Sequence, residues 1–109
     1  EFGVQNYGFL GVFLEQLTPE LSKYFGVPEG QGLLVARLVA GGPAEKAGLK
    51  VGDVIVGADG KRVETLPALS RILQKKKKGE KLVLEIIRDR KKMELEVAIS
   101  GSILEEGRD

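Results

Sequence analysis

The sequence of 109 residues contains no histidine and no cysteine. Without them, Ser-His-Asp and Cys-His catalysis, thiol redox chemistry and the usual zinc sites are excluded. The absence of cysteine also leaves the redox compartment open, because neither disulfide bonds nor free thiols point to one. No apolar run approaches the ~18 residues that a membrane-spanning helix requires. The first residues do not resemble a signal peptide, so any export signal is expected to lie outside this sequence.

The sequence also lacks an excess of either charge, since 17 basic and 16 acidic residues leave a net charge of +1. This balance argues against a nucleic-acid-binding surface. The one concentrated charge is the run from Lys75 to Lys78. Cations at the C-terminal end of a helix complement its dipole, so the favoured interpretation is a solvated helix end. A weak contact with an anionic lipid or another polyanionic surface is the alternative.

Glycine is plentiful, with 15 residues, and together with four prolines it divides the chain into short elements. Pro19 and Pro43 suit the first position of a helix, and Gly26 and Gly48 suit the left-handed residue that ends one. The pair Asp59-Gly60 predicts a two-residue hairpin. The patterns predict helices at 19–25, 43–47 and 66–77, and strands at 12–17, 32–39, 54–58, 61–63, 81–88 and 92–99.

These elements predict one α+β domain, a partly open barrel or sandwich of five or six short strands with two or three helices. Residues 1–100 form the domain, its core begins at residue 7, and residues 1–6 are a lead-in. Residues 7–11 form a turn, residues 89–91 join the last two strands, and Leu49 and Val51 cover the core. We expect residues 101–109 to be a flexible tail, partly derived from a vector, as Glu1-Phe2 also is.

A glycine-containing turn, Phe9-Leu10-Gly11-Val12, leads into the first predicted strand. Such a turn can direct successive backbone N–H groups at one point and bind an anion. The strand that leaves it can pair with an extended peptide. We therefore predict a groove that captures a peptide C-terminus, carboxylate first. Gly11 permits close approach of the backbone because it lacks a Cβ, although a simple β-bulge is the alternative.

The order of motifs along the chain resembles a PDZ domain, and more closely the bacterial type found in HtrA-family serine proteases. The resemblance covers about residues 7 to 100 and looks like the permuted strand order of the bacterial members. Its motifs are Phe9-Leu10-Gly11-Val12, Leu17-Thr18-Pro19-Glu20-Leu21, Gly42-Pro43-Ala44, Ala47-Gly48-Leu49, Gly52-Asp53-Val54-Ile55, Asp59-Gly60-Lys61 and Val83-Leu84-Glu85-Ile86-Ile87-Arg88.

The resemblance implies that Phe9-Leu10-Gly11-Val12 is the loop that binds the carboxylate, through the N–H groups of its last three residues. The peptide would lie between the strand 12–17 and the helix 66–77. The groove residues implied on these two elements are Leu10, Val12, Phe13, Leu14, Leu66, Leu69, Ser70 and Leu73. Two alternatives remain: Leu69 and Leu73 are wholly core residues, and Phe13 packs across strands instead of facing the peptide.

This sequence differs from the better-known animal PDZ domains at one position that affects which peptides are preferred. Those that prefer Ser or Thr two residues before the terminus carry a histidine at the start of the groove helix. This sequence has Leu66-Pro67 there. We therefore expect a preference for apolar residues, including the last one.

The leading hypothesis is a non-catalytic module that recognises C-terminal peptides for an HtrA-like envelope protease. The resemblance implies a periplasmic or cell-envelope location and a parent protease domain as partner. No cofactor, metal or nucleic acid is expected. The alternatives are a PDZ domain of a C-terminal processing protease or of a site-2-type metalloprotease, or a scaffold module that binds internal segments. In the scaffold case, Ile103-Leu104 of the tail would contact a neighbouring molecule.

An enzymatic role for this domain itself is the remote alternative. Paired carboxylates such as Glu94 and Glu96 can in principle perform acid–base chemistry. Their alternating positions on a predicted strand instead favour an exposed face.

Overall fold

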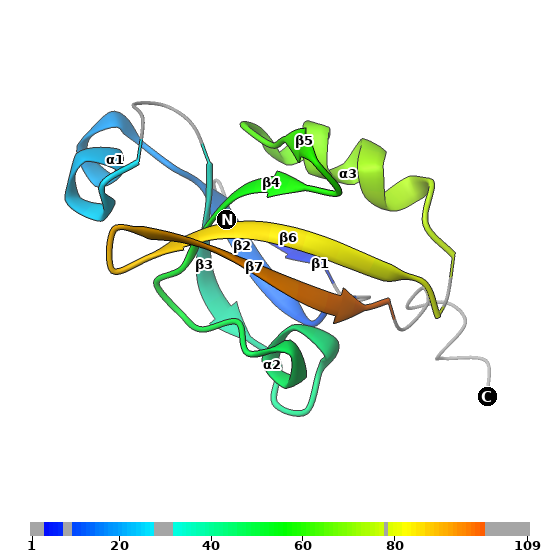
Figure 1. Cartoon of the computed structure of the whole chain (residues 1–109). Coiled ribbons are helices and arrows are strands. Elements are labelled where there is room, and N and C mark those ends of the chain that lie inside the picture. The colour runs from blue at the N-terminus through cyan, green and yellow to red at the C-terminus, as the bar shows by residue number, and fades with distance from the viewer. Residues whose placement is uncertain (1–3, 8–9, 28–31, 78, 100–109) are drawn as a thin grey trace.

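The computed structural model describes residues 4–7, 10–27, 32–77 and 79–99 (Figure 1). Its strands are β1 (Val4–Tyr7), β2 (Val12–Gln16), β3 (Leu33–Leu38), β4 (Val54–Ala58), β5 (Lys61–Arg62), β6 (Lys81–Arg88) and β7 (Lys91–Ala98). Its helices are α1 (Pro19–Phe25), α2 (Pro43–Ala47) and α3 (Leu66–Gln74). The strands form one antiparallel sheet in the order β1-β2-β3-β4-β6-β7, with β5 paired to β4.

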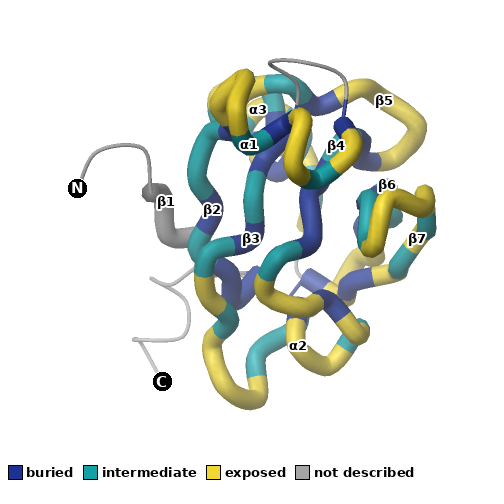
Figure 2. The backbone as a smooth tube through the Cα atoms, turned by 90° about the vertical axis from the view of Figure 1, so that its left-hand side faces the viewer, coloured by how far each residue is buried: buried dark blue, intermediate teal, exposed yellow. Residues whose placement is uncertain are grey.

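The predicted α+β class is confirmed, and the one additional strand is β1. Residues 4–6 were predicted to be a lead-in and Tyr7 to be part of a turn, but all four belong to β1, so both predictions are wrong. A four-residue strand at one edge of a sheet leaves little periodicity to detect. The strand β2 pairs with β1 on one side and with β3 on the other, and Figure 2 shows β2 beside β3.

The helix boundaries follow from capping. The Thr18 side chain accepts a hydrogen bond from the Leu21 N–H, and Gly26 ends α1 at φ 74°. The Thr65 side chain caps α3 in the same way, accepting from the Ala68 N–H. These side chains satisfy N–H groups that the first helical turn leaves unpaired. The helix α3 nevertheless stops at Gln74, three residues before its predicted end.

The two central residues of each hairpin turn have left-handed backbone conformations. Asp59 and Gly60 have φ values of 51° and 80°, and Asp89 and Arg90 have values of 52° and 67°. Two successive residues with positive φ match the right-handed twist of the flanking strands. The β6–β7 turn therefore uses two residues instead of the predicted three, and Lys91 opens β7.

The core lies between the sheet and the helices, and β6 contributes Leu82, Leu84 and Ile86 to it, as predicted. Leu49 is also buried, whereas Val51 is 62% exposed, so its prediction as a core residue is wrong. The Asp53 carboxylate accepts a hydrogen bond from the Lys50 N–H and closes a turn with Val51 at its apex. In Figure 1, α3 lies above the β6–β7 hairpin and α2 lies below it.

The lysine run is only partly a solvated helix end. Lys76 Nζ lies 2.6 Å from Asp59 Oδ2 and donates a hydrogen bond to the Lys81 carbonyl. Lys76 thereby ties the end of α3 to the β4–β5 turn and to β6. Lys75 caps α3, and Lys78 lies outside the described residues.

The pairing with Lys76 affects the ionisation of Asp59. Partial burial alone would raise the pKa of Asp59, but hydrogen bonds from Lys76 and the Val83 N–H, with the charges of Lys76 and Lys61, outweigh it. The pKa of Asp59 is therefore lowered in the folded state. A lowered pKa means that Asp59 stabilises the fold above about pH 4, and that this contribution is lost as the pH falls through the folded-state value.

We expect Asp59→Asn to reduce the free energy of unfolding at pH 7 by less than about 1 kcal/mol, because partly exposed ion pairs contribute little. Asparagine tolerates the left-handed turn, so the substitution removes mainly the charge. Urea unfolding at pH 7 and at pH 2 measures the effect. The difference from the parent chain should shrink at pH 2, and Glu94→Gln on exposed β7 is the control. A difference that grows in acid contradicts the assignment.

Candidate functional site

The loop before β2 has its carbonyl groups held by neighbouring segments. The Leu10 carbonyl accepts a hydrogen bond from the Ala44 N–H at 2.8 Å, and the Gly11 carbonyl accepts one from the Val39 N–H at 2.9 Å. In a trans peptide unit the N–H points opposite to the C=O. The N–H groups of Gly11 and Val12 therefore point away from these two partners. Successive N–H donors of this kind can bind an anion.

The conformation of Gly11 depends on the start of α2. Gly11 has φ 74°, a left-handed value that disfavours other residues. A Cβ at this position would lie 3.2 Å from both Gly42 Cα and Pro43 Cδ. Gly42 and Pro43 therefore seat the loop against α2, a tertiary role that the sequence analysis did not predict.

Main-chain groups alternate in direction along β2. At its start the Gly11 carbonyl points to the β3 side, and just beyond its end the Leu17 N–H donates to the Gly32 carbonyl on that same side. Alternate residues of a strand direct their main-chain groups to the same side. The main-chain groups of Val12 and Leu14 therefore face the other edge of β2.

That other edge of β2 is where β1 lies. The two strands are antiparallel, with Tyr7 opposite Val12 and Gln5 opposite Leu14. The edge predicted to receive a peptide is thus covered by a strand of the chain itself.

The structure brings the predicted pocket residues together, but it buries them. The side chains of five of them belong to one core cluster and are at most 2% exposed: Leu10, Val12, Leu14, Leu69 and Leu73. Leu66 is partly buried against the same cluster, and Ser70 is half-buried on α3. Phe9 lies outside the described residues. In this conformation the five residues are core residues, which was the alternative considered for Leu69 and Leu73.

Phe13 does not lie with these residues. Its ring is half-buried, and the Arg37 guanidinium carbon lies 5.0 Å from the ring centroid. Arg37 is its direct cross-strand neighbour on β3. Phe13 therefore packs across strands, the second interpretation considered for it.

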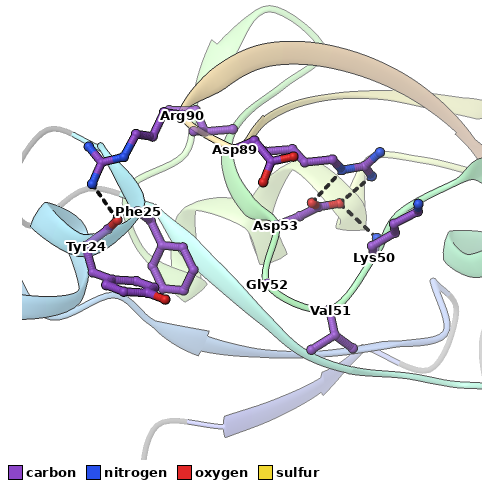
Figure 3. Close-up of a pocket in the computed structure, with 10 residues that line it drawn as sticks. Tyr24, Phe25, Lys50, Val51, Gly52, Asp53, Asp89 and Arg90 are labelled. Atoms are coloured by element: carbon purple, nitrogen blue, oxygen red, sulfur yellow. Dashed lines mark hydrogen bonds and ion pairs between the residues drawn. The ribbon is translucent and has the colours of Figure 1, made fainter.

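A separate hollow of about 740 Å³ lies between the end of α1, the turn before β4 and the β6–β7 turn (Figure 3). The ring of Tyr24, which is 71% exposed overall, lies at one side of it. At the other side the Arg88 guanidinium binds both carboxylate oxygens of Asp53, at 2.7 and 2.8 Å. The hydrogen bond to Asp53 raises the pKa of Arg88 above the ordinary value of an arginine.

This hollow is larger than the one of about 590 Å³ that Gly11, Gly42 and Pro43 help to line, yet we favour the loop as the functional site. None of the residues that line the hollow belongs to β2, α3 or the loop. Its main polar groups also bind one another, because Asp53 accepts from Arg88 and from the Lys50 N–H, and Arg90 donates to the Tyr24 carbonyl. Groups already paired in this way serve the fold more readily than a ligand.

Neither a metal-ligand cluster nor a membrane-spanning helix occurs among the residues that the structure describes. Within residues 4–7, 10–27, 32–77 and 79–99, no group of three or more Asp or Glu residues is placed to hold a metal ion. In the same part of the chain, no helix has the length and apolar character needed to cross a bilayer.

Comparison with protein families and curated proteins gives a consistent result. Residues 8–99 match the family model for the PDZ domain. The chain is 37% identical over 107 residues to a probable periplasmic serine endoprotease, DegP-like, from Pseudomonas savastanoi pv. phaseolicola, covering 98% of this chain and 22% of the relative. A protein of the same description from Chlamydia trachomatis is 41% identical over 100 residues, with 92% and 20% covered. The chain therefore spans about a fifth of these relatives, and the part it matches is their non-catalytic PDZ portion.

Comparison with solved structures also identifies proteins of the HtrA type. The HtrA-type protease AlgW with a decapeptide has a TM-score of 0.73 and 29% identity, with 89% of this chain and 29% of that chain covered. The HtrA3 PDZ domain bound to a phage-derived ligand has a TM-score of 0.69 and 24% identity, with 83% and 82% covered. The second similarity is one of fold.

Proposed function

The chain belongs to the PDZ domain family, and on that premise we propose that it captures the free C-terminus of a protein or peptide. The peptide is added as a strand to the outer edge of β2, with its carboxylate at the loop that contains Leu10 and Gly11. The observation that supports this proposal is the direction of the Gly11 and Val12 N–H groups. Both point away from the segments that hold the loop carbonyls.

A carboxylate at this loop loses its hydration and gains hydrogen bonds from backbone donors. A hydrogen bond to a charged acceptor contributes roughly 1.5–3 kcal/mol. We assign these donors to the N–H groups of Leu10, Gly11 and Val12. An amide in place of the carboxylate carries no charge and presents an NH₂ group to the same donors, so it is a poor ligand for this loop.

The last side chain of the peptide would occupy the apolar region between β2 and α3. Leu14 of β2 and Leu69 and Leu73 of α3 meet there. Their burial means that binding requires α3 and β2 to separate enough to admit a side chain. Burying a Val, Leu or Phe side chain contributes about 1.5–3 kcal/mol. The cost of ordering the peptide offsets much of the total, so we expect a micromolar affinity, about −7 to −8 kcal/mol.

We expect amidation of the C-terminus to weaken peptide binding by at least about tenfold, the loss that one charge-assisted hydrogen bond represents. The measurement is a screen of this chain against random peptides with free C-termini, followed by fluorescence polarisation with the acid and amide forms of each hit. A copy of each hit that ends in Asp instead of an apolar residue is the control for pocket preference. Equal binding of acid and amide forms would move the function to recognition of internal segments.

The same proposal extends to the whole protein. We propose that this domain, within residues 1–100, serves an HtrA-like serine protease of the periplasm and presents or senses protein C-termini for it. The support is the 37–41% identity to the DegP-like relatives, which are named as periplasmic serine endoproteases. Proteolysis of an unfolded substrate by the full-length protein, with and without a binding peptide, tests this role.

A further inference from the structure

We propose that β1 is an intramolecular occupant of the peptide-binding edge, and that it must leave β2 before a peptide can bind. This inference rests on the proposed function, because it concerns the regulation of the same site. It differs from that function in assigning a role to the strand of residues 4–7, to which the proposed function assigns none.

The first observation is the polarity of β1. The strand runs antiparallel to β2, and its last residue, Tyr7, lies opposite Val12 at the loop end of β2. A peptide bound with its carboxylate at the loop would run in the same direction. The strand β1 therefore has the place and the polarity that the proposed ligand requires.

The second observation is the set of main-chain groups involved. The Gly11 carbonyl and the Leu17 N–H, which flank β2, bind segments on the β3 side. Because main-chain groups alternate along a strand, those of Val12 and Leu14 face the edge where β1 lies. Strand addition uses these same groups. Each N–H donates to one strand partner at a time, so β1 and a peptide exclude each other.

The third observation is the closed pocket. With β1 in place, the side chains of Val12, Leu14 and Leu69 are all 0% exposed. The conformation in which β1 covers the edge is therefore also one in which the apolar region is shut. Both features describe a resting state that does not accept ligand.

The energetic consequence is a competition within one molecule. If only a fraction of molecules have β1 detached, the apparent dissociation constant equals the intrinsic constant divided by that fraction. A short connection gives β1 a high effective concentration at the edge, so even a weak four-residue pairing competes well. Weakening β1 should therefore strengthen peptide binding, whereas the loss of a strand usually weakens the function of a domain.

Two proline substitutions separate pairing from other effects. Gln5 lies opposite Leu14 and Asn6 lies opposite Phe13. By the alternation described above, the main-chain groups of Leu14 face β1 and those of Phe13 face β3. Proline lacks an N–H and is tolerated in an edge strand only where that N–H faces solvent. Gln5→Pro should therefore detach β1, and Asn6→Pro is its matched control. A chain lacking residues 1–7 is a second variant with the same purpose.

The probe is a pool of heptapeptides with free C-terminal Val, Leu or Phe, measured by fluorescence polarisation. We expect Gln5→Pro and the shortened chain to bind about tenfold more tightly than the parent chain, and Asn6→Pro to stay within about twofold. Hydrogen exchange provides an independent readout. The Val12 and Leu14 amides should exchange faster in Gln5→Pro, while the Leu84 amide in β6 should be unchanged.

Two outcomes would overturn the inference and leave the proposed function intact. One is faster exchange at Val12 and Leu14 with unchanged affinity for the free-acid peptides. The other is that Gln5→Pro and Asn6→Pro bind the peptides with equal affinity. This holds whether both variants bind more tightly than the parent chain or both bind as the parent chain does. Failure of all variants to bind any free-acid peptide, with the Leu84 amide still protected, overturns the proposed function itself and the inference with it.

Discussion

Replacing Asp53 with alanine is expected to lower the free energy of unfolding by about 3–5 kcal/mol, the typical cost of removing one partner from a buried ion pair. Asp53 is 2% exposed, and both of its carboxylate oxygens bind Arg88. The substitution leaves the guanidinium without its counter-ion and the Lys50 N–H without its acceptor. Because the Arg88 side chain remains 22% exposed, we expect a value near the lower end of this range.

The cause can be isolated with a second substitution. Adding Arg88→Met to Asp53→Ala removes the unpaired charge, so the double variant should recover part of the lost stability. Glu94→Ala, an exposed carboxylate on β7, is the control and should change the free energy of unfolding by no more than about 0.5 kcal/mol. Urea unfolding measures all three variants. A loss below about 1 kcal/mol in Asp53→Ala would show that the ion pair does not hold the turn before β4 to β6.

The second large effect is expected at Gly11. Gly11→Ala should cost about 2–3 kcal/mol of stability, because the left-handed backbone is strained for alanine. The new Cβ also lies 3.2 Å from Gly42 Cα and Pro43 Cδ, so the loop must move away from α2. That movement displaces the N–H groups proposed to bind the carboxylate. We therefore expect affinity for free-acid peptides to fall by more than about tenfold. This fall is larger than the one that a decrease in the folded fraction alone would cause.

Gly41 provides a closely matched control. Its φ of 76° is nearly the same as the 74° of Gly11, but a Cβ built there meets nothing within 4 Å. Gly41→Ala thus carries the same backbone strain without the contact. It should lose a similar part of the stability and keep its peptide affinity, as measured by urea unfolding and fluorescence polarisation. If both variants bind peptide equally, the seating of the loop against α2 has no role in binding.

Much of the fold was predictable because it is encoded locally. Thr18 and Thr65 cap helices, and Gly26 and Gly48 end them at left-handed φ values. The alternation of Leu82, Leu84 and Ile86 identifies one face of β6. Each of these signals acts within a few residues of its own position, so no tertiary information is needed to detect it.

The candidate site was predictable only in part. The residues from Leu10 to Leu14 and those of α3 were identified from the order of motifs along the chain. Whether these residues line an open groove or are buried could not be decided, since an apolar helical stripe has the same pattern in both cases. The contact of Lys76 with Asp59 of the β4–β5 turn was also not predictable, because the two residues are brought together only by the tertiary fold.

The class of fold, the boundaries of most elements and the position of the glycine loop were all predictable from the order of residues. These depend on capping residues, turn residues and alternation, which are local properties of the chain. The three-dimensional structure was needed to show which edge of β2 is covered, where the loop carbonyls bind and whether the apolar region is open. Those features depend on hydrogen bonds and contacts between segments far apart in the chain, such as Gly11 with Val39 and Leu10 with Ala44. Pairing of this kind is set by the register of the whole sheet, and no short pattern of residues records it.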